Sequence, residues 1–348
     1  MRFLYGLSVL APIAILGDFL GWSPVLIFAL AAAALIPLAG LLGRATEELA
    51  THTGPRLGGL LNATLGNAAE LIITIFAIRA GLLELVKASI TGSILGNILL
   101  VLGLAMLMGG LRNGVQSFHR ETAGMNATMM ILAVVALIVP SVFSHTIDTV
   151  NHAGVEWLSI GVAIAMLAVY ILSLVYAFAP ASRAAEVHDH APGKAHWSVR
   201  KSIAWLLVST AFVAWLSEVL VGAVEPVVEA WGISEFFLGI VIIPLIGNVA
   251  EHLVAVQAAW KNKMELGMAV AVGSSLQIAL FVAPLLVFVS LLLGNPLTLV
   301  FNSFELVALA GASLIAAVIA FDGKSNWLEG AQLLSVYAIT ALAFYYLP

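Results

Sequence analysis

The chain has 348 residues, of which 62% are hydrophobic and only 9% are charged, with a formal net charge of −5. Soluble proteins carry about 25% charged residues, so this composition predicts a protein embedded in lipid. The absence of cysteine excludes disulfides, thiolate catalysis and cysteine-based zinc or iron–sulfur sites.

The N-terminal stretch, residues 1–21, is apolar after Met1 and Arg2. A secretory signal peptide ends in a small-residue cleavage site, but Asp18 and Trp22 follow here instead. We therefore expect a retained first transmembrane helix.

Apolar runs of about 20 residues, the length that spans a bilayer, continue along the chain. Because a span in lipid must satisfy its backbone hydrogen bonds internally, we expect helices throughout and an all-α integral membrane protein. About eleven spans are predicted: 3–20, 23–43, 56–80, 85–111, 122–142, 154–179, 201–223, 235–260, 265–293, 299–321 and 327–347.

The charged residues between these spans predict an orientation. If the N-terminus lies on one side, that side holds twelve of the 14 Lys and Arg residues, and the opposite side holds Arg79 and Lys87. Positive residues concentrate on the cytoplasmic side, so we expect a cytoplasmic N-terminus and a C-terminus outside or in a lumen. In a prokaryote the host membrane would be the cell membrane.

One polar motif occurs twice. Residues 66–70, Gly-Asn-Ala-Ala-Glu, return at 247–251 as Gly-Asn-Val-Ala-Glu, an offset of 181 positions. The same offset aligns roughly a third of residues 66–105 with identical partners and needs no gap. Duplication of a polar motif in an apolar chain predicts a transporter with its site at the repeat interface.

The offset divides the spans into two groups of five. Five is odd, so the two copies would enter the membrane in opposite orientations and form an inverted repeat. The predicted organisation is an N-terminal helix, a first repeat, a cytoplasmic linker and a second repeat: 1–21, 22–180, 181–200 and 201–348. Three histidines and an aspartate in the linker lack a fixed ligand spacing, which favours a solvated loop over a regulatory metal site: His188, Asp189, His190 and His196.

The acids of the two motifs, Glu70 and Glu251, are the strongest functional candidates. A carboxylate at membrane depth costs several kcal/mol unless something compensates it. The nearest basic residues, Arg79 and Lys261, are at helix ends, so ion ligation is favoured over structural pairing. Gly66 and Gly247 are expected to let the helix loosen just before each acid.

Oxygen-bearing side chains surround these acids at helical spacing. Thr74 shares a helix face with Asn67 and Glu70. Ser89 shares a face with Ser93 and Asn97, and Ser275 is next to Ser274. Hard oxygen ligands favour Ca²⁺, Mn²⁺, Na⁺ or protons, although small and amide residues also serve ordinary helix packing. The predicted ligand set is Glu70, Glu251, Asn67, Asn248, Ser93, Asn97, Ser274 and Gln277.

The two acids also suggest a mechanism. Neighbouring carboxylates in a poorly solvated place hold protons when no cation is bound. A divalent cation matches their charge and binds where those protons leave, so ion and proton compete for one site.

Other polar residues are weaker candidates. His252 is a proton-relay or a packing residue. Glu218 and Glu305 are proton-path candidates or solvated helix ends, and neither has an acidic partner at the repeat offset. Glu48 and Glu229 do match at that offset and are gate or vestibule candidates, with a solvated loop as the alternative.

The motifs GNAAEL and GNVAEH, followed by GSILGN and GSSLQI, resemble those of the cation/proton exchanger family. These are the Ca²⁺/H⁺ antiporters of the wider Ca²⁺/cation antiporter superfamily. The resemblance implies that Glu70 and Glu251 are the central Ca²⁺- and proton-binding acids, with the other six ligands around them. Sodium/calcium exchangers usually carry a further acid where Gln277 stands, which favours protons as the counter-ion.

The expected function is therefore exchange of cytoplasmic Ca²⁺ for protons by alternating access. Alternatives are a Na⁺-coupled or Mn²⁺-preferring exchanger, a passive cation channel, and a membrane scaffold with inert acids. No enzyme motif competes, because the serines lack a His/Asp arrangement and no glycine-rich phosphate loop follows a strand. No cofactor or nucleic-acid partner is expected; the partners are Ca²⁺, H⁺ and the lipid bilayer.

Overall fold

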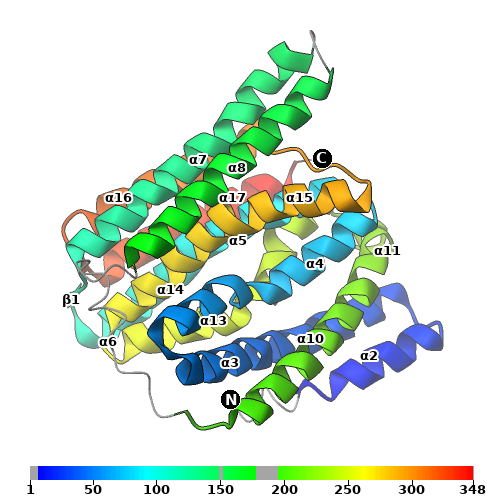
Figure 1. Cartoon of the computed structure of the whole chain (residues 1–348), viewed down its shortest axis with the longest axis horizontal. Coiled ribbons are helices and arrows are strands. Elements are labelled where there is room, and N and C mark those ends of the chain that lie inside the picture. Colours follow the sequence, from blue (N-terminus) through cyan, green and yellow to red (C-terminus); the bar gives the residue numbers. More distant parts are fainter. Residues whose placement is uncertain (1–6, 149–151, 178–194, 348) are drawn as a thin grey trace. The chain divides into compact units, whose positions relative to one another are not determined.

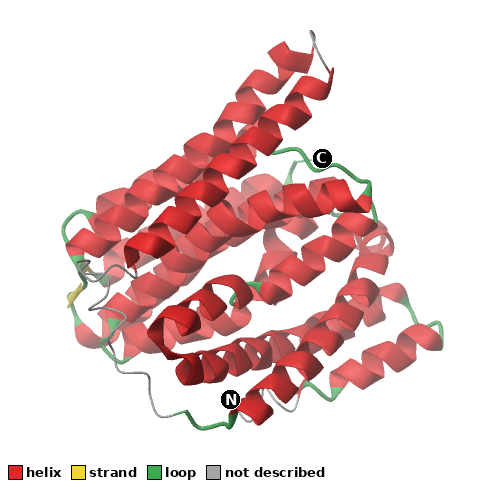
Figure 2. Cartoon of the chain, viewed as in Figure 1, coloured by secondary structure: helices red, strands yellow, loops and turns green. Residues whose placement is uncertain are grey.

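The computed structural model describes residues 7–148, 152–177 and 195–347, and these are overwhelmingly helical (Figures 1 and 2). They pack as two compact units. The first unit comprises Met1–Ala80, Val169–Ile233 and Ile246–Ala250, and the second comprises Gly81–Ala168, Ser234–Leu245 and Glu251–Pro348. Each unit takes segments from both halves of the sequence, so the compact units differ from the sequence repeats.

The first unit is built on a long helix, α3, which packs against α2, α4, α10 and α11. The final residues of α8 and one turn of α13 complete it. Its whole helices are α2 (Leu10–Phe19), α3 (Pro24–Leu65), α4 (Ala68–Arg79), α10 (Val199–Gly222) and α11 (Val224–Trp231).

The second unit holds most of the remaining helices and a short two-stranded sheet, in which Gln116 pairs with Ser325. Three of its segments are π-helical, labelled η. Its elements are α5 (Leu83–Leu95), η1 (Gly96–Val101), α6 (Leu102–Asn113), β1 (Gln116–Ser117), α7 (Arg120–Asp148), most of α8 (His152–Ala177), α12 (Glu235–Phe237), η2 (Leu238–Ile242), most of α13 (Ile243–Trp260), α14 (Met264–Gln277), η3 (Ile278–Val282), α15 (Ala283–Leu293), α16 (Ser303–Ala320), β2 (Lys324–Ser325) and α17 (Trp327–Tyr345).

Two features of the sequence shape α3: a kink at Gly54 and a break between α3 and α4. Gly54 has φ 81° and ψ 170°, a conformation open to glycine, and it kinks the helix. The helix then ends at Leu65, and Asn67 leaves helical geometry with φ −98° and ψ 28° before α4 begins. The first motif therefore lies at a helix break, as the glycine at position 66 predicts.

Among the described residues, eight helices are long and apolar enough to cross a membrane. One further candidate is a bent pair, Val224–Trp231 with Glu235–Val249, whose axes differ by 112°. The expected first span is represented by α2, which is too short for that test, and the expected span 56–80 is divided by the break at Asn67. The membrane-helix architecture is confirmed, while the number eleven stays a prediction.

Helix boundaries follow the repeat offset closely. The segment Leu83–Asn113 corresponds to Met264–Leu293, because both begin at equivalent positions and end within one residue of equivalence. Both also contain a π-helix at the same place, η1 and η3. Arg79 and Trp260, which end α4 and α13, are likewise 181 positions apart. A π-helix inside an α-helix often marks a functional site, so its repetition directs attention to these two segments.

Close helix packing explains one of the repeated glycines. A Cβ atom on Gly92 of α5 would collide with the backbone carbonyl of Ile240 in η2, whereas a Cβ atom on the equivalent Gly273 would meet nothing within 4 Å. The close backbone contact with Ile240 therefore requires glycine at position 92, whereas no such contact requires glycine at position 273.

We predict that Gly92→Ala lowers the thermal unfolding midpoint of the detergent-purified protein by several degrees, because overpacking costs about 1–3 kcal/mol. Gly273→Ala is the matched control and should leave the midpoint unchanged or slightly raised, since alanine favours helix. Equal effects of the two substitutions would contradict the packing argument.

Candidate ion-binding site

Glu70 lies in the first turn of α4, directly after the break that Asn67 makes. Glu70 is only 7% exposed, and Asn67 is also buried. A helix N-terminus favours negative charge by about 0.3–1 kcal/mol, which is less than the several kcal/mol that burial in hydrocarbon costs. The backbone therefore favours the carboxylate at this position without compensating it fully.

Thr74, one turn after Glu70, is buried but already occupied. Its hydroxyl donates to the carbonyl oxygens of Glu70, at 2.7 Å, and of Leu71, at 3.0 Å. The shared face predicted for the two side chains exists, and the hydroxyl of Thr74 serves the helix backbone.

The two motifs meet within the first unit. A Cβ atom on Gly247 would lie 3.2 Å from Cγ and 3.5 Å from Cδ of Glu70, so the carboxyl group packs against this glycine. Asn248 follows and is buried. The prediction that Gly247 loosens the helix is wrong, because α13 is continuous from Ile243 to Trp260. Gly247 instead leaves room for Glu70.

In the second unit, α5 and η1 carry the polar face predicted from the first half. Ser89, Ser93 and Asn97 are all buried. Neither the amide nitrogen nor the amide oxygen of Asn97 has a hydrogen-bond partner among the described residues. Buried polar groups are normally hydrogen-bonded, so this amide is suited to a ligand. It lies within the π-helix η1.

The equivalent face on α14 carries two of the predicted ligands, Ser274 and Gln277, beside a serine that bonds to the backbone. Ser274 is buried and Gln277, the last residue of α14, is half-buried. The hydroxyl of Ser275 lies 3.0 Å from the carbonyl oxygen of Ala271 and 3.4 Å from that of Ile94. Ser275 therefore links α14 to α5. Because Ile94 and Ser275 are separated by the repeat offset, equivalent positions of the two segments touch at this crossing.

Glu251 and His252 belong to the part of α13 that packs in the second unit, and both are half-buried. Nε2 of His252 is buried without a hydrogen-bond partner among the described residues. Unlike Glu70, Glu251 lies within an unbroken helix, so no nearby helix end favours its charge.

Two of the outlying acids are exposed. Glu218 lies on α10 with 58% of its side chain exposed and pairs with Arg79 at 3.6 Å, which favours a solvated position over a buried proton path. Glu229 is exposed on α11. Exposed ion pairs such as Arg79–Glu218 contribute little to stability.

Glu48 is buried and forms hydrogen bonds with the backbone at the end of the linker. Its Oε2 accepts backbone N–H groups from His196, at 2.8 Å, and Trp197, at 3.0 Å. The other linker residues singled out, His188, Asp189 and His190, lie outside the described residues. Within the described ranges there is no group of three or more His, Asp or Glu side chains placed to hold a metal.

Trp197 is the centre of a group of contacts that the sequence does not predict. The carbonyl oxygen of Trp197 lies 2.7 Å from Nε2 of His52, and its ring lies 5.0 Å from the guanidinium of Arg44 and 4.8 Å from the ammonium of Lys201. Arg44, Glu48 and His52 recur every four residues on α3, a spacing that the sequence displays.

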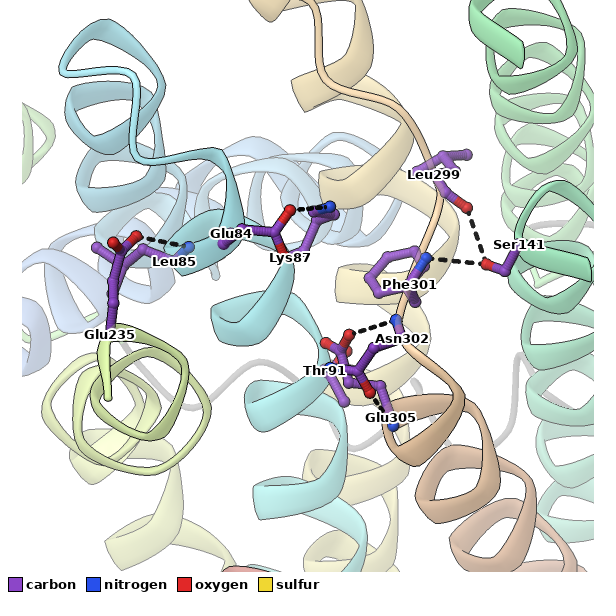
Figure 3. A network of polar contacts seen from close by, with 10 residues as sticks. All are labelled: Glu84, Leu85, Lys87, Thr91, Ser141, Glu235, Leu299, Phe301, Asn302 and Glu305. Atoms are coloured by element: carbon purple, nitrogen blue, oxygen red, sulfur yellow. Dashed lines mark hydrogen bonds and ion pairs between the residues drawn. The ribbon is translucent and has the colours of Figure 1, made fainter. Parts of the chain in front are cut away.

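Glu305 is buried at the N-terminus of α16, where it forms a reciprocal capping box with Asn302. Its other carboxylate oxygen accepts the hydroxyl of Thr91 at 2.8 Å (Figure 3). The three-residue spacing of Asn302 and Glu305 is a helix-start signal that predicts this role.

The contact between Gly247 and Glu70 leads to a prediction. Gly247→Ala should displace the Glu70 carboxyl group by a few tenths of an ångström and raise the half-saturating concentration of the divalent cation expected at this site about two- to tenfold, a loss of roughly 0.4–1.4 kcal/mol. Cation-dependent thermal stabilisation of the purified protein measures this. Gly161→Ala, where a Cβ atom would meet nothing within 4 Å, is the control; identical titrations would contradict the steric account.

Comparison with known proteins agrees with this architecture. The sodium/calcium exchanger protein family matches residues 23–179 and 201–346. A Ca²⁺/H⁺ antiporter of Aphanothece halophytica is 47% identical, over 99% of this chain and 96% of its own length. The Ca²⁺/H⁺ antiporter ChaA of Bacillus subtilis is 42% identical, over 97% and 96%.

Solved structures are also similar. The Ca²⁺/H⁺ antiporter protein YfkE is 41% identical with a TM-score of 0.87, covering 100% of both chains. The H⁺/Ca²⁺ exchanger CAX is 17% identical with a TM-score of 0.74, covering 99% of this chain and 91% of its own, and shares the fold. This integral membrane protein therefore belongs to the sodium/calcium exchanger protein family.

Proposed function

We propose that this protein is a secondary transporter that exchanges Ca²⁺ for protons. The observation that carries the proposal is the buried carboxyl group of Glu70, set in the first turn after a membrane-helix break and packed against the glycine of the second motif. Relatives that cover nearly the whole chain at 42–47% identity are named Ca²⁺/H⁺ antiporters, which supports the choice of ions.

Glu70 and Glu251 are proposed to bind either Ca²⁺ or protons. A buried carboxylate needs a compensating charge, and a helix N-terminus supplies too little. Two carboxylates match the charge of one divalent cation, and protonation satisfies the same groups when the cation leaves. The proposed surrounding ligands are Asn67, Asn248, Ser93, Asn97, Ser274 and Gln277, whose oxygen atoms suit a hard cation.

The direction of transport follows from the proposed topology. The excess of Lys and Arg on one side favours a cytoplasmic N-terminus. An inward proton-motive force would then export cytoplasmic Ca²⁺ by alternating access, with one repeat rocking against the other.

A Na⁺-coupled or Mn²⁺-preferring exchanger is the second candidate. Gln277 argues against Na⁺ coupling, because an amide cannot supply the additional negative charge that an acid would supply. A passive channel is separated from both exchangers by uphill transport.

The proposal predicts that proteoliposomes containing the protein accumulate Ca²⁺ under an imposed pH gradient without Na⁺, and that a protonophore abolishes this uptake. Glu70→Gln and Glu251→Gln should each remove the uphill flux, because a neutral amide neither balances Ca²⁺ nor carries the proton. Glu225→Gln alters an exposed acid on α11 and is the matched control.

Retained proton-driven flux in either central variant would refute the assigned roles. Uptake that begins only when Na⁺ is supplied would assign the protein to the sodium-coupled class. Equilibration without uphill accumulation would indicate a channel.

A further inference from the structure

A buried hydrogen bond connects the N-terminus of α16 to α5 (Figure 3). Glu305 is only 1% exposed. One carboxylate oxygen accepts the backbone N–H of Asn302 at 2.9 Å, and the other accepts the hydroxyl of Thr91 at 2.8 Å. The side chain of Asn302 accepts the N–H of Glu305 in return. Both oxygens of this carboxylate are therefore occupied by donors fixed in the fold.

The residue of α5 that makes this contact, Thr91, lies on the face opposite the predicted ligand face. Ser89 and Ser93 share one face, whereas Thr91 lies two residues away, about 200° around the helix. Lys87, one turn before Thr91, lies on the same rear face and pairs with Glu84. The helix thus has a ligand face and an opposite anchoring face.

The anchor has no counterpart at the repeat offset. The position equivalent to Thr91 is Val272 on α14, and the position equivalent to Glu305 is Gly124 on α7. Neither side chain can form this hydrogen bond. Only the first of the two equivalent helices is held in this way.

We propose that Glu305 and Thr91 are positioning residues, which fix the rotation and height of α5 so that Ser93 and Asn97 are correctly placed for the ion. This inference rests on the proposed exchange function and adds residues that do not touch the ion. A hydrogen bond from a buried hydroxyl to a carboxylate is among the stronger ones, and removing its donor leaves an unsatisfied buried oxygen. Movement of the Glu305 carboxylate after the loss of this donor would shift α5.

The test uses the full-length protein with Thr91→Val, which preserves side-chain shape and removes the donor, and Thr91→Ser, which restores it. Thr340→Val is the matched control, because the Thr340 hydroxyl bonds carbonyl oxygens of its own helix, α17. Ca²⁺-dependent thermal stabilisation gives the half-saturating concentration for binding. Proteoliposome exchange over a range of Ca²⁺ concentrations gives the transport KM and the maximal rate.

Thr91→Val should raise the half-saturating Ca²⁺ concentration and the KM roughly three- to tenfold while the maximal rate stays near that of the original protein. Thr91→Ser should recover most of this loss, and Thr340→Val should change neither value. An unchanged KM, a failure of serine to rescue, or an equal effect of Thr340→Val would overturn the inference.

Glu305→Gln separates positioning from proton transport. A positioning role predicts a raised KM with a pH profile of exchange like that of the original protein. Loss of exchange with unchanged Ca²⁺ binding would make Glu305 a proton carrier and overturn the inference. Absence of Ca²⁺ binding by the original protein would overturn the proposed function itself, whereas normal binding by both the original protein and Thr91→Val would overturn only the positioning role.

Discussion

The structure depends on one electrostatic constraint, the burial of a carboxyl group within membrane-spanning helices. Arg79, the basic residue at the far end of α4, pairs with Glu218. The chain breaks its helix at Asn67, so that Glu70 falls in a first turn, and it places Gly247 against the carboxyl group. These features give the acid space and partial stabilisation, and the proposed exchange function adds a bound ion or proton to them.

The sequence predicts the helical membrane fold, the repeat and the helix break, because apolar length and the recurrence of polar positions carry that information. It does not predict the role of Gly247. Glycine permits both a loosened helix and a close side-chain approach, and only the arrangement in space distinguishes the two. Hydropathy likewise treats Glu218 and Glu305 alike, although one is exposed and the other buried. The convergence of the complete ligand set stays a prediction.

Long-range contacts explain the other omission. Trp197 meets residues of α3 that are about 150 positions earlier, so neither local spacing nor composition identifies the partner. The regular spacing of Arg44, Glu48 and His52 shows one face of α3 but not what covers it. Glu305 is an intermediate case, because its capping box is visible in the sequence and its bond to Thr91 is not.

The equivalent halves are similar in helix boundaries and different in detail. Glu70 follows a break while Glu251 lies in a continuous helix, and the Thr91–Glu305 hydrogen bond of α5 has no counterpart at the equivalent position of α14. An exchanger built from inverted repeats needs two arrangements of nearly equal free energy, so such differences in local stabilisation bear directly on which arrangement is preferred.

In the proposed mechanism, Ca²⁺ and protons compete for the same two carboxyl groups. Proton release during Ca²⁺ binding to the purified protein, measured by titration calorimetry in buffers of different ionisation enthalpy, tests it most directly. Ca²⁺ binding should release protons near neutral pH, and Glu70→Gln combined with Glu251→Gln should abolish the release. Tight Ca²⁺ binding without proton release, across the pH range in which exchange operates, would contradict it.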